Sequence, residues 1–287
     1  MIIFKVPADI HAYLLSKKNG KITTGFVPTM GALHQGHIGL INKAKTETAF
    51  VICSIFINPT QFNDPKDFEK YPTTFEKDVY LLEKSGCDAL FLPSVTSMYP
   101  NGFESAFKYD LGDLETILEG KFRPGHFQGV CQVVHRLLDI VIPDQLFLGQ
   151  KDFQQCMVIK KLIQLLNMET QVVICPTRRE LNGLAMSSRN ARLNETDKER
   201  ATTIYQSLRY IHDNIAVGNI NQLKSKAGEM LTSNGFKVDY IELANVKSLE
   251  LVQTWDGIAP LVAVVAAFLN EVRLIDNLLL PADSTNM

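Results

Sequence analysis

The sequence predicts an α/β protein, with a doubly wound, Rossmann-like parallel sheet followed by a smaller α+β domain. Three observations support this fold class. Short apolar runs alternate with amphipathic helical patterns over residues 1–176. These runs contain almost no charged residues, which is typical of parallel strands covered by helices on both faces. After residue 176 the pattern changes to two long helical segments followed by strands, which indicates a separate α+β domain over residues 177–287.

Strands and helices alternate regularly in the first predicted domain. The strands are expected at residues 22–29, 50–57, 87–93, 144–149 and 170–177, and the helices at 37–48, 73–86, 129–143 and 152–167. Right-handed crossovers between such strands give a doubly wound sheet. The longest irregular stretch, residues 58–72, holds three prolines and is a candidate substrate loop or lid. In the second domain we expect helices at 195–218 and 220–235 and strands at 236–246 and 259–269.

Composition and charge exclude several classes of protein. The net charge is −2, from 29 basic and 31 acidic side chains, whereas a protein that binds nucleic acid through many phosphates carries a basic excess. The most apolar segment is interrupted by Asn270, Glu271, Arg273 and Asp276, so no membrane span is expected. The five cysteines are scattered without a C-x-x-C pair, and the N-terminus lacks a signal-peptide pattern. We therefore expect reduced core thiols in a cytoplasmic protein.

The stretch PTMGALHQGHIGLINKA carries the first functional signal. A strand is expected to end near Thr29 and a helix to start near Gly36, with His34 and His37 three residues apart at its first turn. The N–H groups and the positive dipole end of a helix favour an anion such as phosphate. A plain turn with two surface histidines is the alternative, and a metal site would need further ligands nearby. This stretch alone leaves the choice open.

Two further stretches offer cations and hydroxyl groups to a phosphate. In LNGLAMSSRNARL, the residues Ser187, Ser188 and Arg189 follow a flexible Asn-Gly pair, as in a mobile clamp. In FLGQKDFQQ, Lys151 and Asp152 lie between a strand and a helix, at the carboxyl edge of the predicted sheet. The alternatives are a capped helix start with a surface arginine, and an N-capping aspartate with a solvated lysine.

A fourth stretch, FINPTQFN, has a different chemical character. Asn58 and Gln61 offer neutral donors and acceptors beside the apolar Phe56 and Phe62. That combination suits a small polar organic acid better than a phosphate. The alternative is a turn in which asparagine and proline only interrupt the preceding strand.

Together these motifs resemble one family. PTMGALHQGH is similar to the H-x-G-H signature of the class I synthetase and nucleotidyltransferase superfamily, and MSSR to the partner of its second, K-M-S-K-S-type signature. The set FINPTQF, RPGHFQGV, FLGQKDFQQ and LAMSSRN, in this order and spacing, resembles the pantothenate synthetase (pantoate–β-alanine ligase) family. The resemblance runs from about Thr23 to Leu193 and continues more weakly through the rest of the chain.

The resemblance implies ATP-dependent condensation of pantoate with β-alanine, through a pantoyl adenylate, to give pantothenate, AMP and diphosphate. It assigns catalysis to His37, His34, Lys151 and Arg189, with His37 as a proton donor or an electrostatic stabiliser. It assigns the organic substrates to Asn58, Gln61 and Gln155. The residues it assigns to ATP are Met30, Gly31, Ala32, Leu33, His34, Gln35, Gly36, His37, Gly149, Gln150, Lys151, Asp152, Arg178, Met186, Ser187, Ser188 and Arg189. It also implies Mg²⁺ with ATP, a homodimer, and a C-terminal domain that acts as a lid over the ATP site.

Three positions need separate comment. The family usually has Gly-Glu-Lys-Asp where this chain has Gly-Gln150-Lys-Asp, and an apolar residue where this chain has Arg178. Both departures concern the nucleotide, and backbone contacts there would tolerate them. Asp78, in a predicted helix, is a possible water-mediated Mg²⁺ contact, although a solvated helix face is the simpler expectation.

Three other functions compete with the ligase interpretation. A cytidylyltransferase-type enzyme shares H-x-G-H but carries a different second signature and has no use for Asn58, Gln61 and Gln155. An aminoacyl-tRNA synthetase needs a tRNA-binding domain, which a net acidic chain of 287 residues lacks. A catalytically silent nucleotide-binding protein is disfavoured because every motif keeps its histidine, lysine or arginine.

Overall fold

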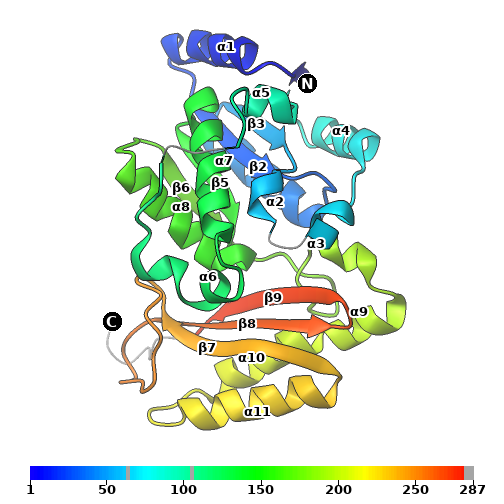
Figure 1. The fold of residues 1–287 in the computed structure, drawn as a ribbon, viewed down its shortest axis with the longest axis vertical. Coiled ribbons are helices and arrows are strands. Elements are labelled where there is room, and N and C mark those ends of the chain that lie inside the picture. Colours follow the sequence, from blue (N-terminus) through cyan, green and yellow to red (C-terminus); the bar gives the residue numbers. More distant parts are fainter. Residues whose placement is uncertain (63–64, 104–106, 281–287) are drawn as a thin grey trace. The chain divides into compact units, whose positions relative to one another are not determined.

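The computed structural model describes residues 1–62, 65–103 and 107–280. The chain divides into two compact units, Met1–Gln150 with Gln154–Pro176, and Lys151–Phe153 with Thr177–Met287 (Figure 1). The short segment Lys151–Phe153 therefore clusters with the second unit, although the chain returns to the first unit directly after it. Among the described residues, no helix is long and apolar enough to cross a membrane.

Six parallel strands form the sheet of the first unit, in the order β1-β4-β3-β2-β5-β6. Their bounds are β1 (Ile2–Phe4), β2 (Thr24–Thr29), β3 (Phe50–Ile55), β4 (Ala89–Phe91), β5 (Gln145–Gly149) and β6 (Gln171–Cys175). The strand order reverses between β2 and β5, which are paired at Gly25 and Phe26. Ligands bind outside the carboxyl ends of the strands at such a switch point. The predicted doubly wound parallel sheet is confirmed.

Helices cover both faces of this sheet, because alternate strand residues enter two different apolar cores. Phe26 and Leu146 share one core with α1, α7 and α8, whereas Val27 and Phe147 share the other with α2 and α4. The helices and short turns of the first unit are α1 (Pro7–Asn19), α2 (Gln35–Glu47), η1 (Pro59–Gln61), α3 (Pro65–Glu69), α4 (Phe75–Lys84), α5 (Val95–Met98), η2 (Gly112–Glu115), α6 (Leu118–Phe122), α7 (His126–Val141) and α8 (Phe153–Leu165). The 3₁₀ turn η3 (Gln150–Asp152) joins β5 to α8.

The second unit is a three-stranded antiparallel sheet, in the order β7-β8-β9, with helices packed against it (Figure 1). Its elements are η4 (Ser188–Arg192), α9 (Glu195–Ala201), α10 (Thr203–Asn214), α11 (Ile220–Ser233), β7 (Phe236–Asn245), β8 (Leu261–Leu269) and β9 (Val272–Leu279). Ala263 and Val265 of β8 share a core with Leu208 of α10 and Leu231 of α11. The predicted α+β character is confirmed, and the last residues of the predicted domain, 281–287, lie outside the described residues.

Two predictions of local structure are wrong. The helix expected over residues 195–218 is broken at Thr202, whose hydroxyl donates to the carbonyl of Glu199 at 2.6 Å and so competes with the helical backbone. The stretch 58–72 is not irregular throughout, because it contains η1 and α3. The proposed lid also includes residues 63 and 64, which lie outside the described residues. Strand β1 has no sequence prediction, since three largely exposed residues are too few to show a period.

All five cysteines are buried, as predicted for core residues. Burial raises the pKa of the Cys87 and Cys131 thiols to about 12, so both remain protonated at neutral pH. They act as small core residues, with Cys53 and Cys87 in one core and Cys131 and Cys156 in the other.

Candidate active site

The H-x-G-H loop leaves the sheet at its switch point. β2 ends at Thr29 and α2 begins at Gln35, so five residues reverse the chain between them. Gly31 and Ala32 both have positive φ, 81° and 48°, a conformation that is easy for glycine and costly for alanine. The loop must therefore be held from outside.

Asp78 of α4 holds this loop. Its carboxylate accepts the backbone N–H of Ala32 at 2.9 Å and that of Leu33 at 2.8 Å, and the Thr74 hydroxyl at 3.0 Å. Only 1% of Asp78 is exposed, so the expected solvated helix face is wrong. The three hydrogen bonds engage both oxygens of this carboxylate, for which the sequence offers a water-mediated Mg²⁺ contact as an alternative. Asp78 stabilises the strained turn that precedes the two histidines.

The two histidines share the N-terminus of α2. The Nδ1 of His34 accepts the N–H of Gly36 at 3.1 Å, and the Nδ1 of His37 accepts the N–H of His34 at 3.3 Å. A nitrogen that accepts a backbone N–H carries no proton, so each ring bears its proton on Nε2. The ring centroids are 4.0 Å apart, a separation at which two imidazolium charges would repel. The pair therefore presents neutral Nε2–H donors at a helix N-terminus, which suits an anion.

Two of the predicted pantoate residues lie at η1, Asn58 directly before it and Gln61 at its end, and they differ in their surroundings. Asn58 has no exposed surface, and its amide donates to Thr60 at 3.0 Å and to the Gly129 carbonyl at 3.2 Å. Its Oδ1 accepts the Tyr99 hydroxyl at 3.0 Å. Burial raises the pKa of Tyr99 to about 12, which keeps this donor protonated. The side-chain amide of Gln61, in contrast, contacts Met30, one of the residues predicted to bind ATP; Gln61 Nε2 lies 2.8 Å from Met30 Sδ.

The RPGHFQGV motif holds η1 in place through a side-chain contact to its backbone, a role that the sequence analysis does not predict. His126 at the start of α7 donates from Nδ1 to the carbonyl of Gln61 at 2.8 Å, and its Nε2 accepts Arg123 at 3.0 Å. Arg123 also lies 3.6 Å from the buried Glu119. A carbonyl only accepts and a guanidinium only donates, so His126 is the neutral Nδ1–H tautomer. The motif is the available signal in the sequence, but its local pattern does not reveal the Gln61 carbonyl as the partner of His126.

The predicted residues around β5 and α8 separate into open and structural positions. Gly149 ends β5 and Gln150 begins η3, both in the first unit, and Gln155 is half-buried on α8. Its neighbour Gln154 is buried, accepts the N–H of Glu119 at 2.9 Å and donates to two carbonyls of the preceding loop. Gln154 therefore holds the loop between η2 and α6, and Gln155 is the residue available to a substrate.

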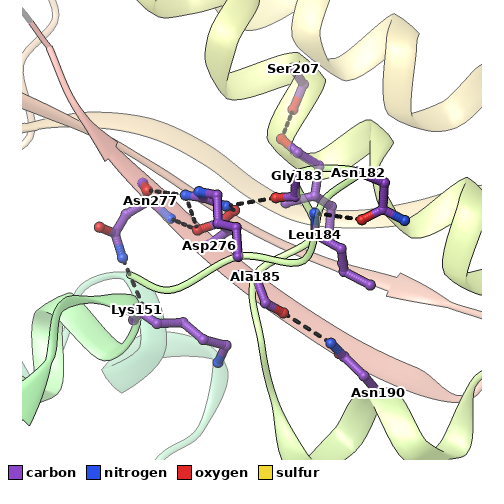
Figure 2. Close-up of polar contacts among 11 residues, drawn as sticks. Lys151, Asn182, Gly183, Leu184, Ala185, Asn190, Ser207, Asp276 and Asn277 are labelled. Carbon is purple, nitrogen blue, oxygen red and sulfur yellow. Dashed lines mark hydrogen bonds and ion pairs between the residues drawn. The ribbon is translucent and has the colours of Figure 1, made fainter. Parts of the chain in front are cut away.

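The remaining predicted residues belong to the second unit. Met186 donates its N–H to the carbonyl of Arg178 at 3.0 Å, and Ser187 caps η4 by accepting the N–H of Arg189 at 3.3 Å. Figure 2 shows Asn190, which donates to the carbonyl of Ala185 at 2.9 Å and so fixes this segment. Lys151 lies 3.7 Å from Asp152, and its side chain is 17% exposed. The first unit thus holds His34, His37, Gln61 and Gln155, and the second unit holds the cationic residues.

Fold and loop together define an α/β protein that carries an H-x-G-H loop at the switch point of a doubly wound parallel sheet. The family model described as pantoate-β-alanine ligase matches residues 2–279. The chain belongs to this family. It is similar to a pantothenate synthetase of Cytophaga hutchinsonii, 42% identical over 275 residues, which are 95% of this chain and 96% of the relative. A pantothenate synthetase of Carboxydothermus hydrogenoformans is 43% identical over 270 residues, 93% of this chain and 94% of the relative.

Solved structures give the same result. Pantothenate synthetase from Thermus thermophilus matches with a TM-score of 0.89 and 37% identity, and the match covers 97% of this chain and 99% of that one. Pantoate-β-alanine ligase from Francisella tularensis matches with a TM-score of 0.82 and 41% identity, over 97% of each chain. The latter was solved as a complex with β-γ ATP and β-alanine.

Proposed function

We propose that this ligase uses ATP to join pantoate to β-alanine in two steps. The pantoate carboxylate attacks the α-phosphorus of ATP, and the bond to the departing diphosphate breaks. The β-alanine amine then attacks the carbonyl carbon of the pantoyl adenylate, the carbon–oxygen bond to AMP breaks, and the nitrogen loses a proton. The observation that carries this proposal is the histidine pair, whose two Nε2–H donors stand at a helix N-terminus at the switch point.

Each type of group then has a separate task. His34 and His37 stabilise negative charge on the phosphates, and the tautomer favours electrostatic help over proton donation by His37. Lys151, Ser187, Ser188 and Arg189 bind the phosphates from the second unit, which we propose acts as the lid. The remaining ATP residues are Met30 to Gly36 in the loop, and Gly149, Gln150, Asp152, Arg178 and Met186.

Gln61 and Gln155 orient pantoate in this proposal, whereas Asn58 acts indirectly. A ligand contact from the Asn58 side chain would require breaking bonds to Thr60, Gly129 or Tyr99 inside a fully buried site. Asn58 is therefore assigned to holding η1, and through it Gln61, against α7.

Magnesium has no protein-built site in the part of the chain that is described. No three His, Cys, Asp or Glu side chains gather there as ligands, and the Asp78 carboxylate accepts three hydrogen bonds from the protein. Mg²⁺ commonly binds through substrate phosphates and water, so it is proposed only as the companion of ATP. The homodimer and the cytoplasmic location expected from the sequence stay predictions.

Product analysis tests the reaction. Incubation with ATP, pantoate and β-alanine should yield pantothenate and AMP in equal amounts, and labelled diphosphate should exchange into ATP with pantoate alone. The exchange follows because the first step is complete before β-alanine reacts. Formation of ADP, or an exchange that strictly needs β-alanine, would remove the adenylate route.

Replacement of Gln155 tests the assignment of pantoate. Gln155→Ala should raise the KM for pantoate by about tenfold to a hundredfold, since a lost hydrogen bond to a charged group costs roughly 1.5–3 kcal/mol, and should change the KM for ATP much less. Gln164→Ala, an exposed glutamine on the same helix, is the control and should change neither constant. An equal rise in both constants for Gln155→Ala would show that this residue does not select pantoate.

A further inference from the structure

Two adjacent polar residues of β9, Asp276 and Asn277, are buried without a part in the proposed chemistry. They are 3% and 2% exposed. Asp276 lies opposite Val265, a member of the helix-covered core, and Asn277 lies opposite Val264, so the two side chains leave the sheet on opposite faces. Buried polar groups cost free energy unless they are hydrogen-bonded, so their partners indicate what they do.

Asp276 binds Arg179. The guanidinium contacts both carboxylate oxygens, at 2.5 and 3.0 Å, and its plane lies over the Tyr205 ring with 3.9 Å to the centroid. Burial raises the pKa of Asp276, and the charges of Arg179 and Lys151 oppose that rise. A two-pronged contact of this kind fixes the orientation of the guanidinium as well as its position.

Arg179 in turn shapes the segment that leads to Met186–Arg189. Its guanidinium donates to the carbonyl of Gly183 at 3.2 Å. Gly183 has a φ of 93°, and a Cβ on it would lie 2.4 Å from the Tyr205 ring, so the turn is pressed against the same ring as Arg179. A β-bridge between Arg179 and Ala185 closes the turn directly before Met186.

Asn277 binds the other proposed phosphate element. Its Nδ2 donates to the backbone carbonyl of Lys151 at 2.9 Å, and its own N–H donates to the Asp276 carboxylate at 2.8 Å (Figure 2). Because the contact is made to the backbone, it fixes the position of Lys151 without engaging the ammonium group. The contact lies within the second unit, to which Lys151–Phe153 belongs.

We infer that Asp276 and Asn277 are positioning residues that hold Lys151 and the Met186–Arg189 segment in one body. Neither side chain touches a reacting atom. Adjacent residues of one strand thereby fix the relative placement of two cations that are distant in sequence. Preorganised charges need no rearrangement when the phosphate arrives, and a small misplacement of such groups is costly. This inference rests on the proposed phosphate-binding roles of Lys151 and Arg189.

Three variants of the full-length protein test it by kinetics and by hydrogen exchange of backbone amides. Asn277→Ala should raise the KM for ATP by about tenfold or more, leave the KM for pantoate within about twofold, and speed exchange at residues 151–153. Arg179→Lys keeps the charge but loses the two-pronged contact to Asp276. It should raise the KM for ATP to a similar extent and speed exchange at residues 178–186. If Asn277→Ala does not fold, Asn277→Asp keeps its shape and removes the donor.

The matched control is Arg273→Lys. Arg273 also belongs to β9, is 17% exposed in its side chain, and binds Asp239 at 2.8 Å. Its conservative replacement should change neither the KM for ATP nor exchange at residues 151–153. Unchanged exchange or an unchanged KM for ATP in Asn277→Ala overturns the inference. Lys151→Ala keeps the backbone contact, so an unchanged KM for ATP in that variant refutes the role of Lys151 itself.

Discussion

Replacing His37 by alanine is expected to lower kcat by about a hundredfold or more, with little change in the affinity for pantoate. The loss of one preorganised donor at developing charge typically has an effect of this size. His37 also accepts the N–H of His34, so alanine removes a helix cap together with the Nε2–H donor. Steady-state kinetics and direct measurement of pantoate binding give the two quantities.

Two further variants separate the functions of His37. In His37→Asn, the amide oxygen lies near the position of Nδ1. This variant should restore the hydrogen bond from the His34 N–H but not kcat. Glutamine places an N–H near the Nε2 position, and should recover part of the rate if the ring acts as a hydrogen-bond donor. Glutamine transfers no proton at neutral pH, so a variant as slow as alanine would favour general acid catalysis. His212→Ala, at a surface histidine paired with Asp213, is the control and should turn over normally.

Gly129→Ala is expected to have the second-largest effect. A Cβ at this position would lie 2.4 Å from the carbonyl oxygen of Thr60 and 3.0 Å from the Cα of Gln61. Both are backbone atoms, so η1 itself must shift, and Gln61 moves with it. We expect kcat/KM for pantoate to fall on the order of a hundredfold. Overpacking should also lower the free energy of unfolding by about 1–3 kcal/mol.

The control for this substitution is Gly228→Ala in the middle of α11. The nearest atom to a new Cβ there is Ile241 Cδ1 at 3.9 Å, an ordinary contact. Alanine should raise the stability slightly, since it loses less backbone entropy than glycine in a helix, and should leave the kinetics alone. An unchanged kcat/KM for pantoate in Gly129→Ala would mean that η1 can shift without loss of activity, and that its packing against α7 does not define the position of the substrate.

The fold could be predicted because its signals are local. Alternating apolar runs and helical patterns identified the strands from β2 to β6 and the change to an α+β unit. The H-x-G-H loop was also local, since its glycines, histidines and helix start are consecutive in the chain. The assignments of individual ligand contacts stay predictions, and Asn58 illustrates why: the sequence shows an amide at a strand end, but not the Gly129 carbonyl that occupies it.

The supports of the site could not be predicted, because each joins distant parts of the chain. Asp78 reaches residues 45 and 46 positions away, His126 reaches Gln61 over 65 positions, and Arg179 reaches Asp276 over 97. Nothing in the local pattern of Asp78 distinguishes a buried anchor from a solvated helix face. Such residues become visible only when the topology brings their partners together.

Lys151–Phe153 belongs to the second unit although the residues on either side belong to the first, and this limits where the chain can be cut or joined to another. A cut at residue 176 looks natural, yet it would leave the lysine in one fragment and the asparagine that seats it in the other. A chimera that takes its C-terminal part from a relative would likewise pair the native Lys151 carbonyl with the residue that the relative has in place of residue 277. Residues 151–153 and residue 277 are therefore expected to change together among related sequences, although a linear domain boundary at residue 176 separates them.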